Sequence, residues 1–322
     1  MSRTKAWITW EVQPRNRSMA KLMDAQYHEL LSESSRFKRY LTLSSQTWKI
    51  FKSKQYDTIF VQNPSIVLAF IGVILGRIFG VKVVVDAHNA GVYPAEGKSK
   101  VLSAIVKFIA HRATMTIVSN EHLVKEVESW GAKAFSMVDP LPELEEFPES
   151  NDKQDFDVLF VCTWAEDEPY HEVIKAAESL PEVTIAVTGN YKKIFAEHEL
   201  DQLPKNINLT GFVSEERYLE LLTTSKVVVD LTTRENCLVC GAYESISAEK
   251  PCILSDTKVN REVFTMGFIY TQNNAEAIAA AIKTALEGEE QLNQDISTAK
   301  KTFLAAEKVR SKEFFAVIET LT

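Results

Sequence analysis

The chain has 322 residues, 45% of them hydrophobic and 25% charged, which is ordinary for a soluble globular enzyme. At roughly 100–200 residues per domain, this length predicts two domains. Acidic residues outnumber basic ones by 44 to 36, and the net charge of −8 disfavours a general nucleic-acid binder, because such proteins usually carry a basic excess.

The first part of the chain alternates short apolar runs with longer helical stretches. The apolar runs are rich in Val and Ile and show little alternation, which is typical of strands buried on both faces of a parallel sheet. Strands and helices in alternation indicate a doubly wound α/β domain. We expect strands over 6–10, 58–62, 81–86 and 115–119, and helices over 19–31, 65–79, 99–110 and 121–130.

The most apolar stretch covers residues 66–80. It is 15 residues long and contains Arg77, whereas a bilayer span needs about 20 apolar residues. The apolar run near the N-terminus is too short for a signal peptide. The four cysteines lie in apolar runs and suit a reducing compartment. We therefore expect a cytoplasmic protein in which residues 66–80 form a buried helix.

A change in composition marks a domain boundary. Residues 139–156 read DPLPELEEFPESNDKQDF, with three prolines and seven acidic residues, which is typical of a linker. We assign a first domain to 1–145, a second to 146–300, and to 301–322 a C-terminal helix that packs back towards the first domain. The alternation restarts after the linker, with strands expected over 158–161, 184–188, 207–209, 227–231 and 252–254, and helices over 171–180, 194–200, 214–223, 242–248, 271–287 and 297–321.

The second half carries the most informative motifs. The stretch TGFV at 210–213 follows an expected strand, and the stretch ESISAEKP runs from Glu244 to Pro251 in a helix of small residues. This order of elements resembles the donor-binding half of GT-B glycosyltransferases of group 1, which are family 4-like. The resemblance implies two Rossmann-like doubly wound domains facing a cleft. The first would be the acceptor-side domain and the second the nucleotide-sugar-binding domain.

Three further stretches resemble the β-1,4-mannosyltransferases of lipid-linked chitobiose. They are QNPS at 62–65, DAHNAG at 86–91 and TWAEDE at 163–168. The resemblance implies transfer of a hexose from a UDP- or GDP-linked donor to a glycan or lipid-linked acceptor, in bacterial polysaccharide or glycoconjugate synthesis. The nucleotide sugar is then a substrate, and no cofactor is expected.

The turn at 86–89 follows an expected strand, so its polar groups emerge at a strand end. His88 is a candidate base, because imidazole accepts protons near neutral pH. A hydrogen bond to the donor sugar, or a purely structural bond to the backbone, explains this histidine equally well. Asp86 orients His88 or is the base itself, and Glu11, which follows the first strand, is a rival base.

The loop after the first strand holds two arginines. Many GT-B enzymes have a glycine-rich loop here, whereas residues 11–18 contain no glycine. Arg15 and Arg17 offer charge-assisted bonds to a phosphate, although two ordinary surface arginines explain the pattern equally well. We assign Arg15, Arg17 and Asn89 to an acceptor or phosphate loop.

The resemblance assigns donor binding to the second half of the chain. Glu244 matches the family glutamate that binds the donor ribose, whereas eight residues separate it from Glu235 rather than the family's seven. A diphosphate leaving group without a metal needs helix N-termini and fixed cations. The expected donor-binding residues are Thr163, Trp164, Gly189, Gly211, Phe212, Val213, Arg234, Glu244, Lys258 and Arg261.

No metal site is expected, because the acidic triplet 166–168 and the lone Cys237-x-x-Cys240 have no further ligands in sight. Two other functions remain open. A sugar-nucleotide epimerase of GT-B shape would place acidic residues such as this triplet around its sugar. A non-catalytic partner subunit of another transferase would account for the missing glycine loop and the altered glutamate spacing.

A basic amphipathic stretch covers residues 98–112, with apolar residues on one broad face and Lys, His and Arg around it. Basic amphipathic helices lie on anionic membranes, although a helix packed on a core with a solvated back gives the same pattern. We therefore expect three partners: the nucleotide sugar, a glycan or lipid-linked acceptor, and the inner face of the membrane through 98–112. No nucleic acid is expected.

Overall fold

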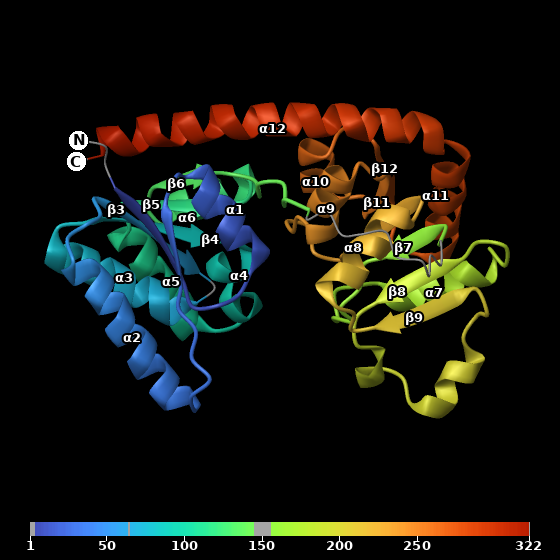
Figure 1. The fold of residues 1–322 in the computed structure, drawn as a ribbon, viewed down its shortest axis with the longest axis horizontal. Helices are drawn as coiled ribbons and strands as arrows, with labels where there is room; N and C mark the ends of the chain where they lie inside the picture. Colours follow the sequence, from blue (N-terminus) through green and yellow to red (C-terminus); the bar gives the residue numbers. More distant parts are fainter. Residues whose placement is uncertain (1–3, 64, 145–155, 322) are drawn as a thin grey trace. The chain divides into compact units, whose positions relative to one another are not determined.

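The computed structural model describes residues 4–63, 65–144 and 156–321. Its contacts divide the chain into two compact units, unit 1 with Met1–Pro140 and Ala305–Thr322, and unit 2 with Leu141–Leu304. Each unit contains a six-stranded sheet covered by helices (Figure 1). The expected α/β class with two Rossmann-like domains is confirmed. Residues 145–155 of the expected linker, and Pro64 of the QNPS stretch, lie outside the described residues.

The sheet of unit 1 has the order β2-β1-β3-β4-β5-β6, and every neighbouring pair is parallel. Strand β3 is buried at every position, because helices cover both faces of the sheet at its centre. The strands are β1 (Lys5–Thr9), β2 (Gln26–Glu29), β3 (Thr58–Asn63), β4 (Lys82–Ala87), β5 (Met115–Val118) and β6 (Ala134–Ser136).

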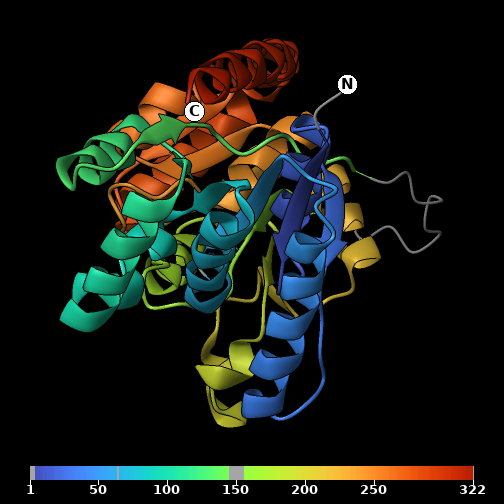
Figure 2. The same cartoon turned by 90° about the vertical axis from the view of Figure 1, so that its left-hand side faces the viewer.

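Helices α2, α3 and α5 of unit 1 cover one face of this sheet (Figure 2). The other face packs against α1 and the end of α12. Gly76 lets α3 come close to the sheet, since a Cβ at that position would lie only 2.3 Å from a methyl group of Val83. The helices are α1 (Pro14–Leu22), α2 (Arg36–Lys52), α3 (Ile66–Phe79), α4 (Asn89–Val92), α5 (Lys100–Arg112) and α6 (Glu121–Ser129), with the short 3₁₀ turn η1 (Pro94–Gly97).

The sheet of unit 2 has the order β12-β11-β10-β7-β8-β9, again with parallel neighbours throughout. Helices α7 and α11 pack on one face of it. The strands are β7 (Val158–Phe160), β8 (Ile185–Thr188), β9 (Ile207–Gly211), β10 (Val227–Asp230), β11 (Cys252–Ser255) and β12 (Phe268–Thr271). The helices are α7 (Tyr170–Glu178), α8 (Glu215–Thr224), α9 (Cys240–Ala248), α10 (Lys258–Val263) and α11 (Ala275–Glu287).

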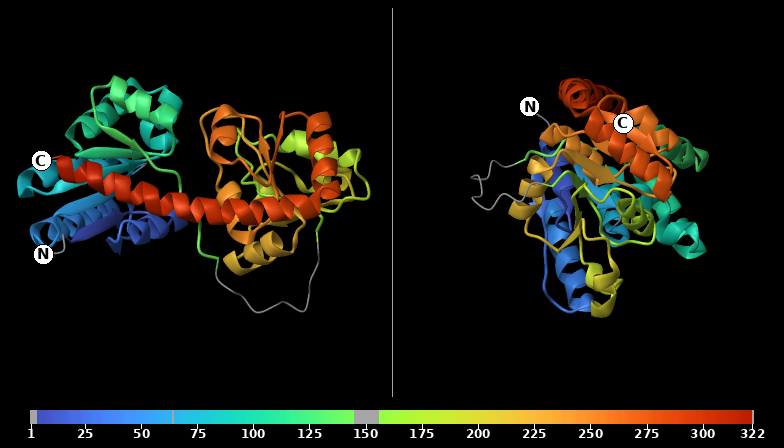
Figure 3. Two further views of the ribbon diagram at one scale, coloured as in Figure 1. Left: turned by 90° about the horizontal axis from the view of Figure 1, so that it is seen from above. Right: turned by 90° about the vertical axis from the view of Figure 1, so that its right-hand side faces the viewer.

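Helix α12 (Glu289–Thr320) contributes residues to both units, as its continuous red ribbon shows (Figure 3). Within unit 2, the Lys300 ammonium group donates a hydrogen bond of 2.8 Å to the carbonyl oxygen of Ser247. Within unit 1, Phe314 and Ile318 are buried against the sheet. None of the helices in the described residues is both long and apolar enough to cross a membrane.

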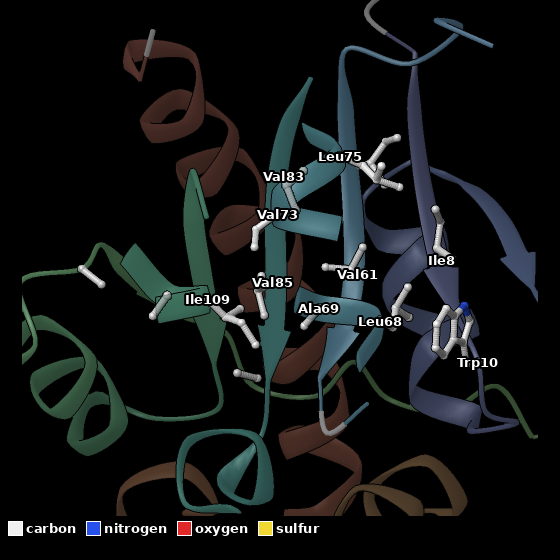
Figure 4. Close-up of a cluster of buried hydrophobic side chains, with 14 of the residues drawn as sticks. Ile8, Trp10, Val61, Leu68, Ala69, Val73, Leu75, Val83, Val85 and Ile109 are labelled. Atoms are coloured by element: carbon white, nitrogen blue, oxygen red, sulfur yellow. The ribbon is translucent and has the colours of Figure 1, made fainter. Parts of the chain in front are cut away.

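The main core of unit 1 lies between its sheet and the helices α2, α3 and α5. Figure 4 shows Ile8, Val61 and Val85 of the strands pointing towards Leu68 and Val73 of α3, and all five side chains are buried. Burying such a side chain contributes roughly 1.5–3 kcal/mol. The apolar stretch 66–80 is therefore a helix of the core, as expected.

Two of the expected helices differ in the structure. The helix expected over 19–31 is wrong, because α1 begins at Pro14 and the chain turns at Asp24, whose φ is +49°, to form the edge strand β2. Pairing with β1 here overrides a sequence that favours helix locally. The helix expected over 194–200 is wrong as well, since two 3₁₀ turns stand there, η2 (Tyr191–Lys193) and η3 (Glu197–Gln202).

Candidate functional site

Polar residues gather where β4 of unit 1 ends, at the carboxyl edge where parallel sheets bind ligands. The Asp86 carboxylate is fully buried and accepts two hydrogen bonds from the Arg15 guanidinium, of 2.8 Å from Nη2 and 3.3 Å from Nε. Arg15 also pairs with Asp139. Two-pronged pairs of this kind fix direction as well as charge. Arg15 thus links the first loop to the end of β4.

Pairing with Arg15 determines the ionisation state of Asp86 at this edge of the sheet. Burial alone would raise the pKa of the Asp86 carboxyl, but the Arg15 charge, helped by His88, holds that pKa well below its usual range. Asp86 is therefore ionised, and with no exposed surface it is placed to orient its neighbours rather than to act as a base. Arg15 is only 9% exposed and is engaged by two carboxylates, unlike the open phosphate ligand expected from the sequence.

Arg17 and Asn89 differ from Arg15 in their surroundings. The Arg17 side chain is 66% exposed and lies 3.6 Å from Glu29, so it remains accessible from solvent. Asn89 is the first residue of α4 and is partly buried. The structure therefore separates the three residues expected to form one acceptor or phosphate loop into one internal ion-pair partner and two accessible side chains.

His88 precedes α4, and its carbonyl oxygen accepts hydrogen bonds from the N–H groups of Gly91 and Val92, of 2.7 and 3.0 Å. Its ring Nε2 lies 3.5 Å from Oδ2 of Asp86, and its side chain is 24% exposed. A buried anion therefore orients the imidazole while part of the ring stays open. An imidazole held in this way is suited to proton transfer.

Glu11, the rival base, belongs to a different network at the ends of β1 and β3. Its N–H donates to Thr9 Oγ1 at 3.1 Å, and Gln13 Nε2 donates to its carboxylate at 3.5 Å. Gln62 joins the network by donating to Gln13 Oε1 at 2.9 Å and accepting from the Thr9 hydroxyl at the same distance. Glu11 is thus held by neutral partners, whereas an ionised carboxylate orients His88.

In unit 2, three expected donor residues meet where β7, β8 and β9 end. Trp164 has a φ of +65° and donates its indole N–H to the carbonyl oxygen of Thr188 at 2.9 Å. Gly189 donates its N–H to the carbonyl oxygen of Gly211 at 3.0 Å. Trp164 is 6% exposed, so it supports these turns from inside rather than offering a face to a ligand.

Replacing Gly189 by alanine is expected to destabilise unit 2 by about 2–3 kcal/mol. Its φ is +87°, which costs an L-residue strain of about 1–3 kcal/mol, and a Cβ there would lie 2.2 Å from the carbonyl oxygen of Cys162. Chemical denaturation measures the loss. Gly80→Ala is the matched control, since Gly80 has a φ of +69° with nothing within 4 Å of its Cβ position. Equal losses in the two variants would show that the contact with Cys162 is harmless.

The acidic triplet 166–168 mostly holds the loop after β7 together. Glu168 accepts a hydrogen bond of 2.9 Å from the Thr163 N–H and one of 2.8 Å from the Thr163 hydroxyl. Asp167 accepts from the Thr232 hydroxyl at 2.9 Å and lies 3.3 Å from Arg234. Within residues 4–63, 65–144 and 156–321, no group of three or more His, Cys, Asp and Glu side chains is placed to hold a metal ion.

Glu244 lies in the second turn of α9, partly buried against α8. Its Oε2 accepts a hydrogen bond from the Tyr218 hydroxyl, and burial raises its pKa. In the described part of the chain its other oxygen accepts no hydrogen bond. One oxygen is thus anchored and the other is open, which suits a carboxylate that receives a ligand hydroxyl.

Asp230, at the end of β10, lies beside the first turn of α9. Its Oδ2 accepts a hydrogen bond of 2.8 Å from the Gly241 N–H, and a Cβ at Gly241 would lie 2.5 Å from the same oxygen. Burial first, and then the charges of Glu244 and Glu168, raise the pKa of Asp230 well above its usual range, against the opposing effect of the Gly241 N–H. Asp230 and Glu244 are therefore coupled electrostatically at the first turns of α9.

The remaining expected donor residues lie on the surface of unit 2. Phe212 is 90% exposed directly after β9, so its ring is open to a flat partner. Lys258 is 88% exposed and lies 3.7 Å from Glu262. Arg261 pairs with Asp256, and its guanidinium lies 4.4 Å from the centre of the Tyr270 ring. Val213 is partly buried beside Phe212.

The sequence did not assign roles to Tyr218 or Asp230, which the structure places beside Glu244. Asp230 closes the apolar run VVVD, so a carboxylate at a strand end was the available signal. Tyr218 had no such signal, because it lies 26 residues from Glu244 in the sequence and the two residues belong to different helices. Long-range contacts of this kind are set by tertiary packing.

Comparisons with known proteins agree on the fold. Residues 143–302 match the family of glycosyl transferases group 1. HepE of Anabaena, solved with UDP and glucose, is 13% identical with a TM-score of 0.75, and the match covers 99% of this chain and 100% of that one. Sucrose-phosphate synthase of Thermosynechococcus elongatus is 12% identical with a TM-score of 0.72, over 99% and 100% of the two chains.

An epimerase shares the same architecture. UDP-GlcNAc 2-epimerase of Methanocaldococcus jannaschii is 12% identical with a TM-score of 0.56, and the match covers 87% of this chain and 92% of that one. No curated protein matches the chain. At these identities the solved structures establish the fold, which is GT-B as expected.

Proposed function

We propose that the protein transfers a hexose from a UDP- or GDP-linked donor to a glycan or lipid-linked acceptor. The GT-B fold and the match of residues 143–302 to the group 1 glycosyl transferases support this proposal. The observation that carries this proposal is Glu244 in the matched unit, with one oxygen bonded to Tyr218 and the other open. A carboxylate held in this way can accept a hydrogen bond from a donor ribose.

The proposed chemistry needs no metal. Arg234, Lys258 and Arg261 have side chains that are 48%, 88% and 54% exposed, so they are accessible to a diphosphate whose charge grows as the sugar leaves. We assign His88 as the base that takes the proton of the acceptor hydroxyl, with Asp86 holding its ring. The pair Asp86–Arg15 keeps this orienting group ionised.

The proposed place of action is the cytoplasm, at the inner face of the membrane, in synthesis of a bacterial polysaccharide or glycoconjugate. The basic stretch 98–112, which α5 largely covers, supports the membrane contact. An epimerase is the second candidate, because one solved neighbour has that activity. The triplet 166–168 gives it little support, since Asp167 and Glu168 are engaged within the loop.

A nucleotide panel tests the proposal by thermal shift. UDP, the nucleotide in the HepE structure, and GDP are expected to raise the melting temperature if either is the donor nucleotide, because binding to the native state stabilises by about 2.7 kcal/mol at 100-fold saturation. Glu244→Ala is expected to remove most of that shift. Measuring the thermal shift of both proteins with UDP, GDP, CMP and dTDP identifies the nucleobase of the donor.

Glu178→Ala is the matched control, because Glu178 is an exposed glutamate on α7 of the same unit. It should leave the nucleotide response unchanged. A Glu244→Ala protein with unaltered affinity would refute the donor-site assignment, and no response to any nucleotide would favour the partner-subunit function. Release of free sugar without an acceptor would identify the epimerase.

A further inference from the structure

One face of unit 1 is cationic in a chain that is acidic as a whole. The face is formed by α2, α3 and α5, which lie side by side over the sheet (Figures 1 and 2), and we call it the cationic face. These three helices contain nine Lys or Arg and no Asp or Glu, although the chain carries a net charge of −8. The nine are Arg36, Lys38, Arg39, Lys49, Lys52, Arg77, Lys100, Lys107 and Arg112.

The same face exposes an unusual amount of apolar surface. Ten of the seventeen large hydrophobic side chains exposed by the described residues belong to these helices, with exposures from 36% to 74%. Large exposed apolar patches on soluble proteins mark sites of interaction. The ten are Phe37, Tyr40, Leu41, Trp48, Val67, Phe70, Ile74, Ile78, Val101 and Phe108.

Helix α3 gives the clearest evidence that this surface is more apolar than an ordinary helix surface. A surface helix normally presents polar residues to water, whereas Arg77 is the one charged residue of α3. Its inner side, with Leu68 and Val73, is buried in the core, while Phe70, Ile74 and Ile78 are exposed at a spacing of four residues. A second apolar stripe therefore faces away from the core.

The exposed stripe continues across the neighbouring helices. The Phe70 ring of α3 lies 5.6 Å from the Phe108 ring of α5, and the Trp48 ring of α2 lies 5.1 Å from the Phe79 ring. Between α3 and α5 lies an apolar groove of about 440 Å³, lined by Phe70, Val101 and Phe108 and bordered by Lys100. Ring contacts thus link α2 to α3 and α3 to α5, and Lys100 borders the groove between α3 and α5.

We propose that the cationic face docks on the surface of an anionic lipid bilayer. Apolar side chains flanked by Lys and Arg enter the boundary between headgroups and acyl chains, while each cation near anionic headgroups adds about 1 kcal/mol. The contact is peripheral, since α3 has only 14 residues. A second copy of this chain fits less well, because a symmetric dimer would place nine cations against nine cations.

The proposal rests on the membrane contact in the proposed function and extends it to α2 and α3. Sedimentation with vesicles tests it without any nucleotide or sugar, so its failure is distinguishable from a failure of the proposed sugar transfer. Wild-type protein should bind phosphatidylcholine vesicles that contain phosphatidylglycerol, and 0.5 M salt should weaken this binding. Lys100→Glu with Lys107→Glu should weaken it at least about tenfold, since two surface cations become anions. Ile74→Ser with Val101→Ser should also weaken it, and that loss should persist in high salt.

Lys175→Glu with Lys283→Glu is the matched control, because both lysines are exposed on helices of unit 2 and lie outside the cationic face. This variant should bind like wild type, and an unchanged melting temperature confirms that each variant is folded. Absence of wild-type binding to anionic vesicles at low salt would overturn the proposal. Equal binding by the Lys100/Lys107 variant, or self-association through this face in solution, would also overturn it.

Discussion

Replacing Arg15 by alanine is expected to destabilise the protein by about 3–5 kcal/mol, the usual cost of leaving a buried charge without its partner. The Asp86 carboxylate has no exposed surface, and Arg15 supplies two of its hydrogen bonds. Arg15 also pairs with Asp139, so its loss leaves two carboxylates without this cation. Chemical denaturation of wild type and variant measures the difference.

Arg17→Ala is the matched control, because Arg17 lies on the same helix but its side chain is 66% exposed. Surface substitutions of this kind usually change stability by less than about 0.5 kcal/mol. A loss for Arg15→Ala that is no greater than the loss for Arg17→Ala would contradict the assigned role of the buried pair. In Arg15→Ala with Asp86→Asn, the buried charge is absent and part of the stability should return.

The pH dependence gives an independent check of the same pair. The pKa of Asp86 is depressed in the folded protein, so its contribution to stability is present above the pKa of the unfolded chain, about 4, and is lost as pH falls towards the folded value. The penalty of Arg15→Ala should therefore be largest near pH 7. It should shrink towards pH 4, where the unpaired Asp86 becomes protonated. A penalty that does not change with pH would show that packing, not charge, is lost.

The sequence predicts the architecture better than the edges of the sheets. Strand β3 and helix α3 are apolar along their length because the fold buries them, so their patterns are unambiguous. Strand β2 is an edge strand in a sequence of helix formers, and only its pairing with β1 reveals it. Helix α2 was not expected, since just three of its residues are buried and its apolar pattern is therefore sparse.

The site shows the same division between local and tertiary information. His88 and Asp86 were expected together because they are two residues apart at a strand end, and the structure places them 3.5 Å apart. The sequence left open whether Arg15 contacts a phosphate or is an ordinary surface arginine. The structure shows it bonded to Asp86, which is 71 residues away in the sequence. Local motifs therefore identified the edge of the sheet, and burial decided which of its charged groups face inward.

His88→Ala is expected to lower sugar transfer by about 10²-fold while leaving nucleotide binding unchanged, the usual scale for loss of a general base. Asp86 is too deeply buried to take over, and Glu11 is held in a separate network by neutral partners. The measurement compares single-turnover transfer with the thermal shift by the donor nucleotide for each variant. Asp86→Asn should slow transfer as well, because the His88 ring then loses the anion that orients it.

Two further variants, His122→Ala and Glu11→Gln, test whether the loss of transfer is specific to His88. His122→Ala removes an exposed histidine on α6 and should transfer sugar at the wild-type rate. Glu11→Gln separates the rival bases, because it should have little effect if His88 takes the proton and a large effect if Glu11 does. Wild-type rates for His88→Ala together with a large loss for Glu11→Gln would assign the base to the end of β1 instead of β4.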